Sequence, residues 1–440
     1  MRFPIKAAIV ASILPVMAQS AGPAAKVTFY RDVLPILQQR CQECHREGEA
    51  APFALMTYEQ TRPWARAIRQ AVLQRKMPPW FAEASEGTFS NDRRLTPRET
   101  ETILAWVDAG TPKGDAHEAP PPRQFTEGWR IGKPDAIVEM PLEFSTPASG
   151  EVDWQYFTAK TDFKEDRWIR AAEARPGNAR VVHHIRVFAR EPGSTAMMER
   201  KPEDSTMRQH PKQIPVDDGS GVIAGTEPGA TELATYVPGG DPVILEPDQA
   251  ILLKAGSDVV FEVHYAPTGK QTTDRSRIGL IFATQPPKVR VAEIGIANRN
   301  LRIPAGASRQ RIDTHVTLQQ DTTVLSVWPH MHLRGTALQL RAVYPSGESE
   351  MLLDVPRYDF NWQMSYVLAR PRLLPKGTRL ETVTYFDNSP NNPYNPNPNV
   401  DVYFGAQTWE EMNMAFLRVA FAPNIDPKDL ARPLSRPKTN

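Results

Sequence analysis

The stretch SDVVFEVHYAPTG, residues 257–269, alternates apolar side chains with other residue types in the manner of a β-strand. Side chains two apart in a strand share a face, so Val259, Phe261, Val263 and Tyr265 form one apolar face and His264 falls on the other. Pro-Thr-Gly follows as a turn signal. The stretch therefore predicts a half-buried strand whose histidine is not an obvious core residue.

Strand-like runs of this kind recur along the chain between Gly, Pro and Asp turns, as in NARVVHHIRVFAR (178–190) and TTVLSVWPHMHLRG (322–335). The chain has 440 residues and 42 prolines, and long amphipathic helical repeats are missing after about residue 110. A chain of this length can form roughly two to four domains. We therefore expect a mainly β protein with several domains.

The charge balance of the chain bears on its partners. The 52 Lys and Arg residues nearly cancel the 51 Asp and Glu residues, which gives no electrostatic case for nucleic acid or an anionic membrane surface as a partner.

Residues 1–20 are typical of an export signal, with Arg2 and Lys6 before the apolar run AAIVASILPVMA. An N-terminal membrane anchor is the alternative, although about twelve apolar residues are short for a span of about 20. We expect a periplasmic or secreted protein without a membrane span in the mature chain.

The only two cysteines, Cys41 and Cys44, lie in the motif CQECH, residues 41–45. This is the C-x-x-C-H pattern of covalent c-type haem attachment, in which two thioethers hold the porphyrin and His45 supplies one axial ligand. The alternatives are a thioredoxin-like redox pair or half of a zinc site. No second cysteine pair exists for zinc, and no βαβ pattern surrounds the motif.

The surrounding sequence, residues 27–115, resembles a small cytochrome c domain. Apolar residues at helical spacing lead into the motif, and TPRETETILAWVDAGTPKGD (96–115) predicts a capped helix closed by Gly110. Met77 in RKMPPW is the predicted second axial ligand, with Met56 as a competitor and a simple core role as the alternative. The proline-rich residues 116–130 then predict a stiff linker.

Histidines are few, nine in total, yet two pairs occur in predicted strands. His330 and His332 are two apart and share a face, with Cα atoms roughly 6.5–7 Å apart, so both could reach one metal ion. The adjacent His183 and His184 would point to opposite faces of a regular strand, so joint chelation requires a local twist or different ring nitrogens. Taken singly, each histidine is more often structural than a ligand.

The order of four motifs changes that estimate: HH, then VHY, then HMHLRG, then QTWEEMNMAF. From about residue 130 to 425 this order resembles the copper type II, ascorbate-dependent monooxygenases, the family of peptidylglycine α-hydroxylating and dopamine β-monooxygenases. The resemblance implies two copper ions: an electron-relay copper and an oxygen-binding catalytic copper. Their implied ligands are His183, His184 and His264 for the first and His330, His332 and Met412 for the second. Met412 is preferred to Met414 because "EEM" matches the family's acidic-acidic-Met pattern.

The resemblance also implies two jelly-roll β-sandwiches, at residues 131–290 and 291–425, which hold one copper each and face each other across a solvent-filled cleft. Residues 426–440 would form a polar tail. Trp328 and Phe416 stand where the peptide-acting branch has an arginine and a tyrosine. A peptide carboxylate is therefore not the expected substrate, and a more apolar or aromatic molecule is.

These observations predict an exported monooxygenase that hydroxylates a C–H bond of a small organic substrate with O2. One covalent haem c would receive electrons from an unidentified donor. It would pass them to the relay copper, which would pass them to the catalytic copper. The linker would raise the effective concentration of haem near copper without a permanent interface. The alternatives are a non-catalytic c-type electron-transfer or copper-binding protein and a structural β-sandwich protein that carries haem.

Overall fold

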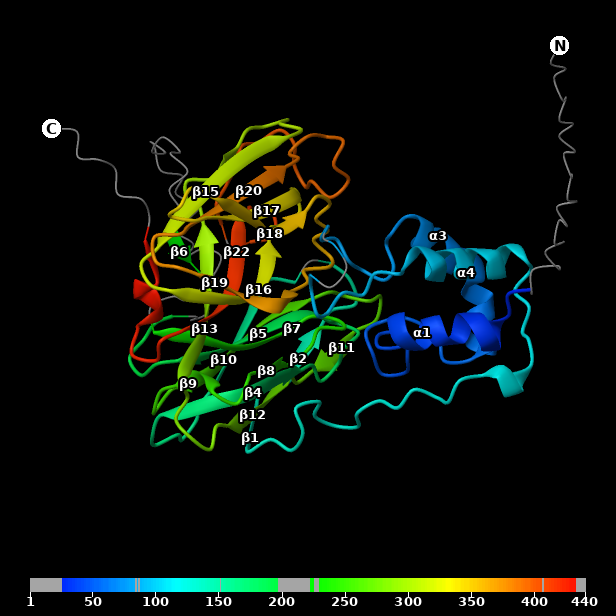
Figure 1. The fold of residues 1–440 in the computed structure, drawn as a ribbon, viewed down its shortest axis with the longest axis horizontal. Helices are drawn as coiled ribbons and strands as arrows, with labels where there is room; N and C mark the ends of the chain where they lie inside the picture. Colours follow the sequence, from blue (N-terminus) through cyan, green and yellow to red (C-terminus); the bar gives the residue numbers. More distant parts are fainter. Residues whose placement is uncertain are drawn as a thin grey trace, which may run out of the picture.

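A computed structural model of the chain describes residues 26–83, 85, 88–150, 152–196, 222–224, 229–405 and 407–432 (Figure 1). The predicted export signal, residues 1–20, and residues 433–440 of the predicted tail lie outside the described residues. Two packed β-sandwiches form most of the molecule, and the helices α1, α3 and α4 lie to one side of them (Figure 1). The predicted mainly β fold with a small helical region before it is confirmed.

The helical region has short helices around one small core. α1 ends directly before Cys41, and α4 starts with a capping box in which Thr96 and Glu99 satisfy each other's backbone N–H groups. Gly110, with a φ of +80°, follows the end of α4 in the left-handed region that favours glycine. The helices are η1 (Phe29–Val33), α1 (Leu34–Arg40), α2 (Tyr58–Thr61), η2 (Arg62–Trp64), α3 (Ala65–Leu73), α4 (Pro97–Asp108) and η3 (Ala116–Glu118).

One sheet of ten strands runs through both sandwiches. Its path is β1-β12-β4-β9-β13-β22-β16-β19, and β6 and β8 pair beside it. The two halves join where β9 and β13 run parallel over a short stretch. Its strands are β1 (Ala136–Glu139), β4 (Arg167–Arg175), β6 (Val222–Ala224), β8 (Val243–Ile244), β9 (Gln249–Leu253), β12 (Arg277–Phe282), β13 (Val289–Ala297), β16 (Thr322–His330), β19 (Tyr366–Leu374) and β22 (Met414–Phe421).

Separate sheets cover the two halves of this long sheet and enclose two hydrophobic cores. The N-terminal half packs on β3 (Gln155–Ala159), β10 (Asp258–Tyr265), β5 (Val182–Arg190) and β7 (Ala230–Tyr236). The C-terminal half packs on β18 (Ser349–Val355), β17 (Gly335–Val343), β20 (Arg379–Phe386), β15 (Gln310–Leu318) and β23 (Ala431–Arg432). Smaller elements are β2 (Phe144–Thr146), β11 (Thr272–Asp274), β14 (Arg302–Ile303), β21 (Val402–Tyr403) and η6 (Pro427–Asp429).

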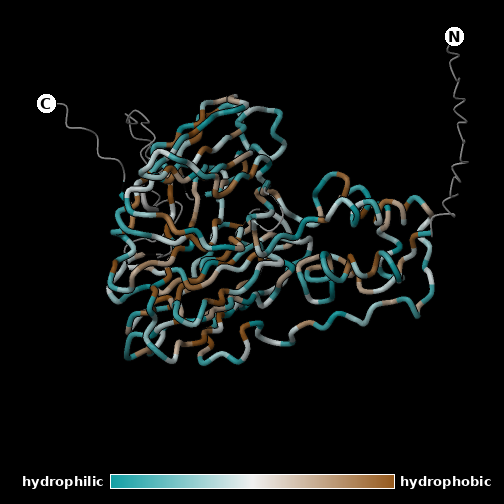
Figure 2. The backbone as a smooth tube through the Cα atoms, viewed as in Figure 1, coloured by the Kyte–Doolittle hydropathy of each residue, from teal (hydrophilic) through white to brown (hydrophobic). Residues whose placement is uncertain are grey.

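The alternation read in residues 257–269 explains how β10 is buried. Its four apolar-face residues lie in the core of the N-terminal sandwich, while His264 on the other face stays outside that core. Figure 2 shows that hydrophobic residues concentrate in the strands of the two sandwiches, whereas many peripheral loops are hydrophilic. Burial of one strand face against the opposite sheet supplies the main driving force for this arrangement.

The helical region is fixed to the C-terminal sandwich, which differs from the expectation of a tethered region without a permanent interface. Trp80 and Phe89, 5% and 4% exposed, pack in the core of the C-terminal sandwich around Tyr366. Asn91 donates a hydrogen bond to the Ser365 carbonyl and accepts one from a backbone N–H of the same strand. Buried aromatic contacts of this kind make the interface part of the fold.

Within the part of the chain that the structure describes, no helix has the length and apolar character needed to cross a membrane.

Candidate metal centres

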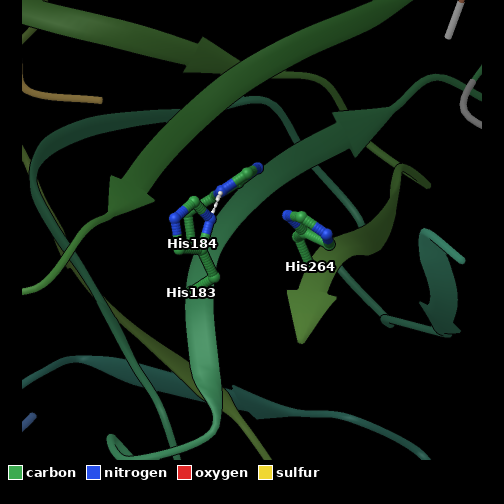
Figure 3. A group of neighbouring side chains, drawn as sticks. All are labelled: His183, His184 and His264. Carbon is green, nitrogen blue, oxygen red and sulfur yellow. Dashed lines mark hydrogen bonds between the residues drawn. The ribbon is translucent and has the colours of Figure 1, made fainter. Parts of the chain in front are cut away.

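A β-bulge brings the adjacent histidines His183 and His184 to one site (Figure 3). In the β5–β10 ladder His184 pairs with His264, but the next residue of β10, Tyr265, pairs with Val182, so His183 is the extra residue. A bulge re-aims side chains that would alternate in a regular strand. Ring nitrogens of the three histidines consequently lie within 4.8 Å of one another, the spacing of a metal-binding group.

The hydrogen bonding of this first cluster leaves ligand nitrogens free. The Nδ1 atoms of His183 and His184 lie 3.0 Å apart, and His183 Nε2 lies 3.3 Å from the Asn361 carbonyl oxygen. His184 Nε2 and His264 Nδ1 are buried and have no hydrogen-bond partner among the described residues. Trp154 stacks on His264, with ring centroids 5.2 Å apart, and closes one side of the cluster. Unpartnered buried nitrogens on His184 and His264, in a cluster of three imidazoles this close together, suit a copper ion.

The second histidine pair lies at the end of β16, and both rings are held through Nδ1. His330 Nδ1 lies 2.6 Å from Gln363 Oε1, and His332 Nδ1 lies 3.1 Å from the Glu410 carbonyl oxygen. These acceptors fix the tautomer with the proton on Nδ1, so each ring presents an unprotonated Nε2. His332 Nε2 is buried without a partner among the described residues. The pair therefore also fits a metal.

The pairing of β16 with β22 places Met414 beside this pair. Trp328 pairs with Phe416 and His330 pairs with Met414. Residues directly opposite each other in an antiparallel pair share one face, so Met414 lies on the face of His330. Met412 precedes the first residue of β22, is half-buried and packs on the cluster that contains Trp328 and Met414. Met412 remains the ligand that the resemblance predicts.

Among the residues that the structure describes, one aromatic ring touches both histidine groups, whereas the resemblance implied a solvent-filled cleft between them. Phe360 lies between them, with ring-centroid distances of 5.7 Å to His183, 6.2 Å to His264 and 6.5 Å to His332. His184 and His330 are 0% and 5% exposed. The two sites therefore face each other across an aromatic side chain.

Burial keeps these imidazoles neutral. It lowers the pKa of His264 to about 3 and the pKa of His332 to about 4, and it places the pKa of His184 and His330 well below the ordinary value. The Arg186 cation lowers the pKa of His184 and His330 further. Neutral imidazole is the form that binds a metal, so the environment favours ligand-competent histidines.

A buried carboxylate, Glu411, holds the backbone of the second site. Its Oε2 accepts the N–H of His332 at 2.9 Å, and its Oε1 accepts the N–H of Arg334 at 2.6 Å. The Arg334 side chain donates to Asn388 Oδ1 and to the Trp409 carbonyl oxygen. The loop before Met412 and the strand end that carries the histidines are therefore tied together.

A cavity of about 100 Å³ lies beside the second site. Its lining includes Trp328, Phe416, Gln363 and Glu293. The Trp328 and Phe416 rings stack with centroids 5.0 Å apart, and the Arg186 guanidinium lies over both. The two residues that set this chain apart from the peptide-acting branch thus form an aromatic wall next to His330.

The residues of the CQECH motif line a larger cavity of about 440 Å³. Cys41, Cys44, His45 and Met77 all contribute to its wall, whereas Met56 does not. His45 Nδ1 lies 3.1 Å from the Phe53 carbonyl oxygen, which leaves Nε2 available to an iron. Burial raises the pKa of Cys41 to about 12, the reverse of the lowered pKa typical of redox-active Cys-x-x-Cys pairs. These side chains fit a covalent haem.

Several residues around the sites were not predicted from the sequence: Trp154, Arg186, Phe360, Gln363 and Glu411. Gln363 lies 33 residues from His330, Phe360 lies still farther from His183 and His264, and neither belongs to a motif. Only Glu411 had a local signal, because it belongs to the EEM sequence that selected Met412.

Comparison with known proteins gives little similarity. No family model and no curated protein sequence matches this chain. Among solved structures, the major capsid protein P2 of bacteriophage PM2 is similar at 8% identity and a TM-score of 0.25, covering 68% of this chain and 99% of that chain. The VP2 subviral particle of infectious bursal disease virus is similar at 8% identity and a TM-score of 0.18, with coverages of 69% and 78%. Similarity at this level supports no functional argument.

Proposed function

We propose that this protein is an exported haem- and copper-dependent monooxygenase that hydroxylates a C–H bond of a small organic substrate with O2. The observation that carries the proposal is the convergence of His183, His184 and His264, whose ring nitrogens lie within 4.8 Å of one another next to a second histidine pair. A structural role for these histidines would not require a bulge that turns two adjacent imidazoles to one point.

The proposed reaction consumes one O2, two electrons and two protons; one oxygen atom enters the substrate as a hydroxyl group and the other leaves as water. Copper at the two histidine sites would supply dioxygen binding and one-electron transfer, and a c-type haem would supply the electrons. His183, His184 and His264 would hold the relay copper. His330, His332 and Met412 would hold the catalytic copper, because two imidazoles with a thioether suit the reduced ion.

The chain's own residues prepare the second site for this chemistry. Gln363 and the Glu410 carbonyl group orient the rings of His330 and His332, and Glu411 holds the backbone N–H groups of His332 and Arg334. Phe360 contacts both histidine groups, and the side chains of His184, His330 and His332 are buried, which would limit the access of water to them. The aromatic wall of Trp328 and Phe416 suits an apolar or aromatic substrate.

The first test is the iron and copper content per chain, by elemental analysis, after export through a c-type haem maturation system and reconstitution with copper. One iron and two coppers support the proposal. One iron without tightly bound copper would contradict it and favour the non-catalytic c-type electron carrier.

The second test uses Met412→Ala, with Met351→Ala as the control, since Met351 is 40% exposed on β18. We expect Met412→Ala to abolish oxygen uptake coupled to substrate oxidation and to leave the haem spectrum unchanged. Met351→Ala should retain both properties. Substrate oxidation that persists in Met412→Ala would remove this residue from the catalytic site.

A further inference from the structure

The cavity that contains the CQECH motif is lined by the helical region, by the N-terminal sandwich and by Asn361 and Trp362 of the C-terminal sandwich. The helical region supplies the motif and Met77, and the N-terminal sandwich supplies the opposite wall, including Arg180, Val182 and His183. The two walls touch: a Cβ added at Gly239 would come within 2.7 Å of Cys44 Sγ. The N-terminal sandwich is therefore part of the pocket around the haem motif.

Five arginines line this cavity, and four of them already have acceptors. Arg40 pairs with Glu99, Arg93 with the Gly239 carbonyl oxygen, Arg123 with Glu43 and Arg130 with Asp241. The fifth, Arg180, has no hydrogen-bond or ion-pair partner for its guanidinium among the described residues. Its side chain is exposed at the cavity wall, so it is the cation still available to an anionic ligand.

A haem carries two propionate carboxylates, and a guanidinium is the side chain that binds a carboxylate with two parallel hydrogen bonds. We propose that Arg180 binds a propionate of the haem attached at Cys41 and Cys44. Arg180 lies three residues before His183, so this contact fixes the haem against the strand that carries the first copper site. The inference rests on the proposed function in one respect, the presence of haem.

The test measures the haem midpoint potential by spectroelectrochemistry on the full haem-loaded chain. Arg180→Gln is compared with Arg66→Gln, which removes the same charge from an exposed position of α3 that does not line the cavity. A nearby guanidinium favours the more negative, reduced haem and the ionised propionate. We expect Arg180→Gln to lower the potential and to move its pH dependence to higher pH. Arg66→Gln should do neither, and Arg180→Lys should retain most of the wild-type potential.

Equal potentials in Arg180→Gln and Arg66→Gln, on chains that carry one haem each, would overturn the inference and leave the proposed function intact. If phosphate or acetate shifts the wild-type potential and this shift disappears in Arg180→Gln, then Arg180 binds a free anion in place of the propionate, which also overturns the inference. A wild-type chain that acquires no haem would overturn both proposals, and the iron analysis identifies that case.

Discussion

At the residue scale, the nitrogen that each histidine presents depends on its hydrogen-bond partner. Gln363 is 3% exposed, and its side-chain Oε1 lies 2.6 Å from Nδ1 of His330. The backbone carbonyl oxygen of Gln363 accepts the indole N–H of Trp328 at 2.9 Å. The orientation of His330 thus rests on one side chain that is itself held by the aromatic wall.

Replacing Gln363 with Leu should weaken copper binding at the second site by roughly 10- to 100-fold, because the ring loses the acceptor that orients it. Copper titration of the haem-loaded chain measures the change. Gln339→Leu, on β17 and bonded to Asp354, is the matched control and should leave copper binding unchanged. Equal affinities in the two variants would remove Gln363 from the metal site.

Histidine burial also predicts how the copper-free protein responds to acid. The pKa of His332 is about 4 in the folded state, below the ordinary value of 6.5, because the side chain is buried. On acidification the unfolded chain therefore binds the proton first, so stability present above about pH 6.5 is lost as the pH falls toward about 4. For His332 alone, the loss in the free energy of unfolding is at most about 3 kcal/mol.

Guanidinium denaturation of copper-free protein at pH 7 and pH 5 checks this expectation. His332→Gln removes the group and should reduce the difference in unfolding free energy between the two pH values. His117→Gln changes an exposed histidine of η3 and should leave that difference as in wild type. An unchanged difference in His332→Gln would contradict the assignment.

At the element scale, β5 joins the first histidine cluster to the contact between the sandwiches. The strand carries His184 and, two residues later, Arg186, whose guanidinium lies 2.5 Å from Glu293 of β13. Glu262 of β10 lies 3.9 Å from the same guanidinium. Burial raises the pKa of Glu293 to about 7, and Arg186 counteracts that rise. Arg186 thus faces carboxylates from two other strands, and Arg418 also lowers the pKa of Glu293.

Substituting Arg186 with Met should destabilise the protein by about 3–5 kcal/mol, because it leaves buried carboxylates without their cation. Arg311→Met, which breaks an exposed pair with Asp313, should cost less than about 1 kcal/mol. Denaturant midpoints at pH 7 compare the two variants. Similar losses in both would mean that the buried cluster adds no more stability than a surface pair.

At the scale of the whole molecule, the segment between α3 and α4 connects the helical region to the C-terminal sandwich. Its residues Trp80 and Phe89 are buried in that sandwich's core, and Phe89 also forms a β-bridge with Leu368. Since the same region carries Met77 and borders His183, its position determines the distance between the CQECH motif and the first histidine cluster.

Truncating Phe89 to Ala should cost about 3–5 kcal/mol and expose the segment around it to limited proteolysis. Trp64→Ala, in the same helical region but 41% exposed, should cost less and leave the proteolysis pattern unchanged. Thermal unfolding and mass spectrometry of the fragments provide the measurements. A protected segment in Phe89→Ala would show that the interface does not depend on this ring.

Local sequence patterns were sufficient for the strands and the capped helix, whereas the candidate ligand set came from the order of four motifs along the chain and the resemblance that this order carries. The alternation in β10 and the Thr96–Glu99 capping box depend on neighbours within a few residues, so their physical cause is present in the sequence itself. The spacing of His330 and His332 on one face is likewise a local property.

Only the tertiary structure decided how the strands, the histidine groups and the helical region contact one another. The bulge at His183 arises from pairing with β10, some 80 residues away in sequence, and Phe360 separates the two histidine groups through long-range packing. The docking of Trp80 and Phe89 replaces the expected free tether for the same reason. Side-chain period and turn chemistry act over a few residues, whereas register, bulges and domain contacts follow from burying apolar surface between distant segments.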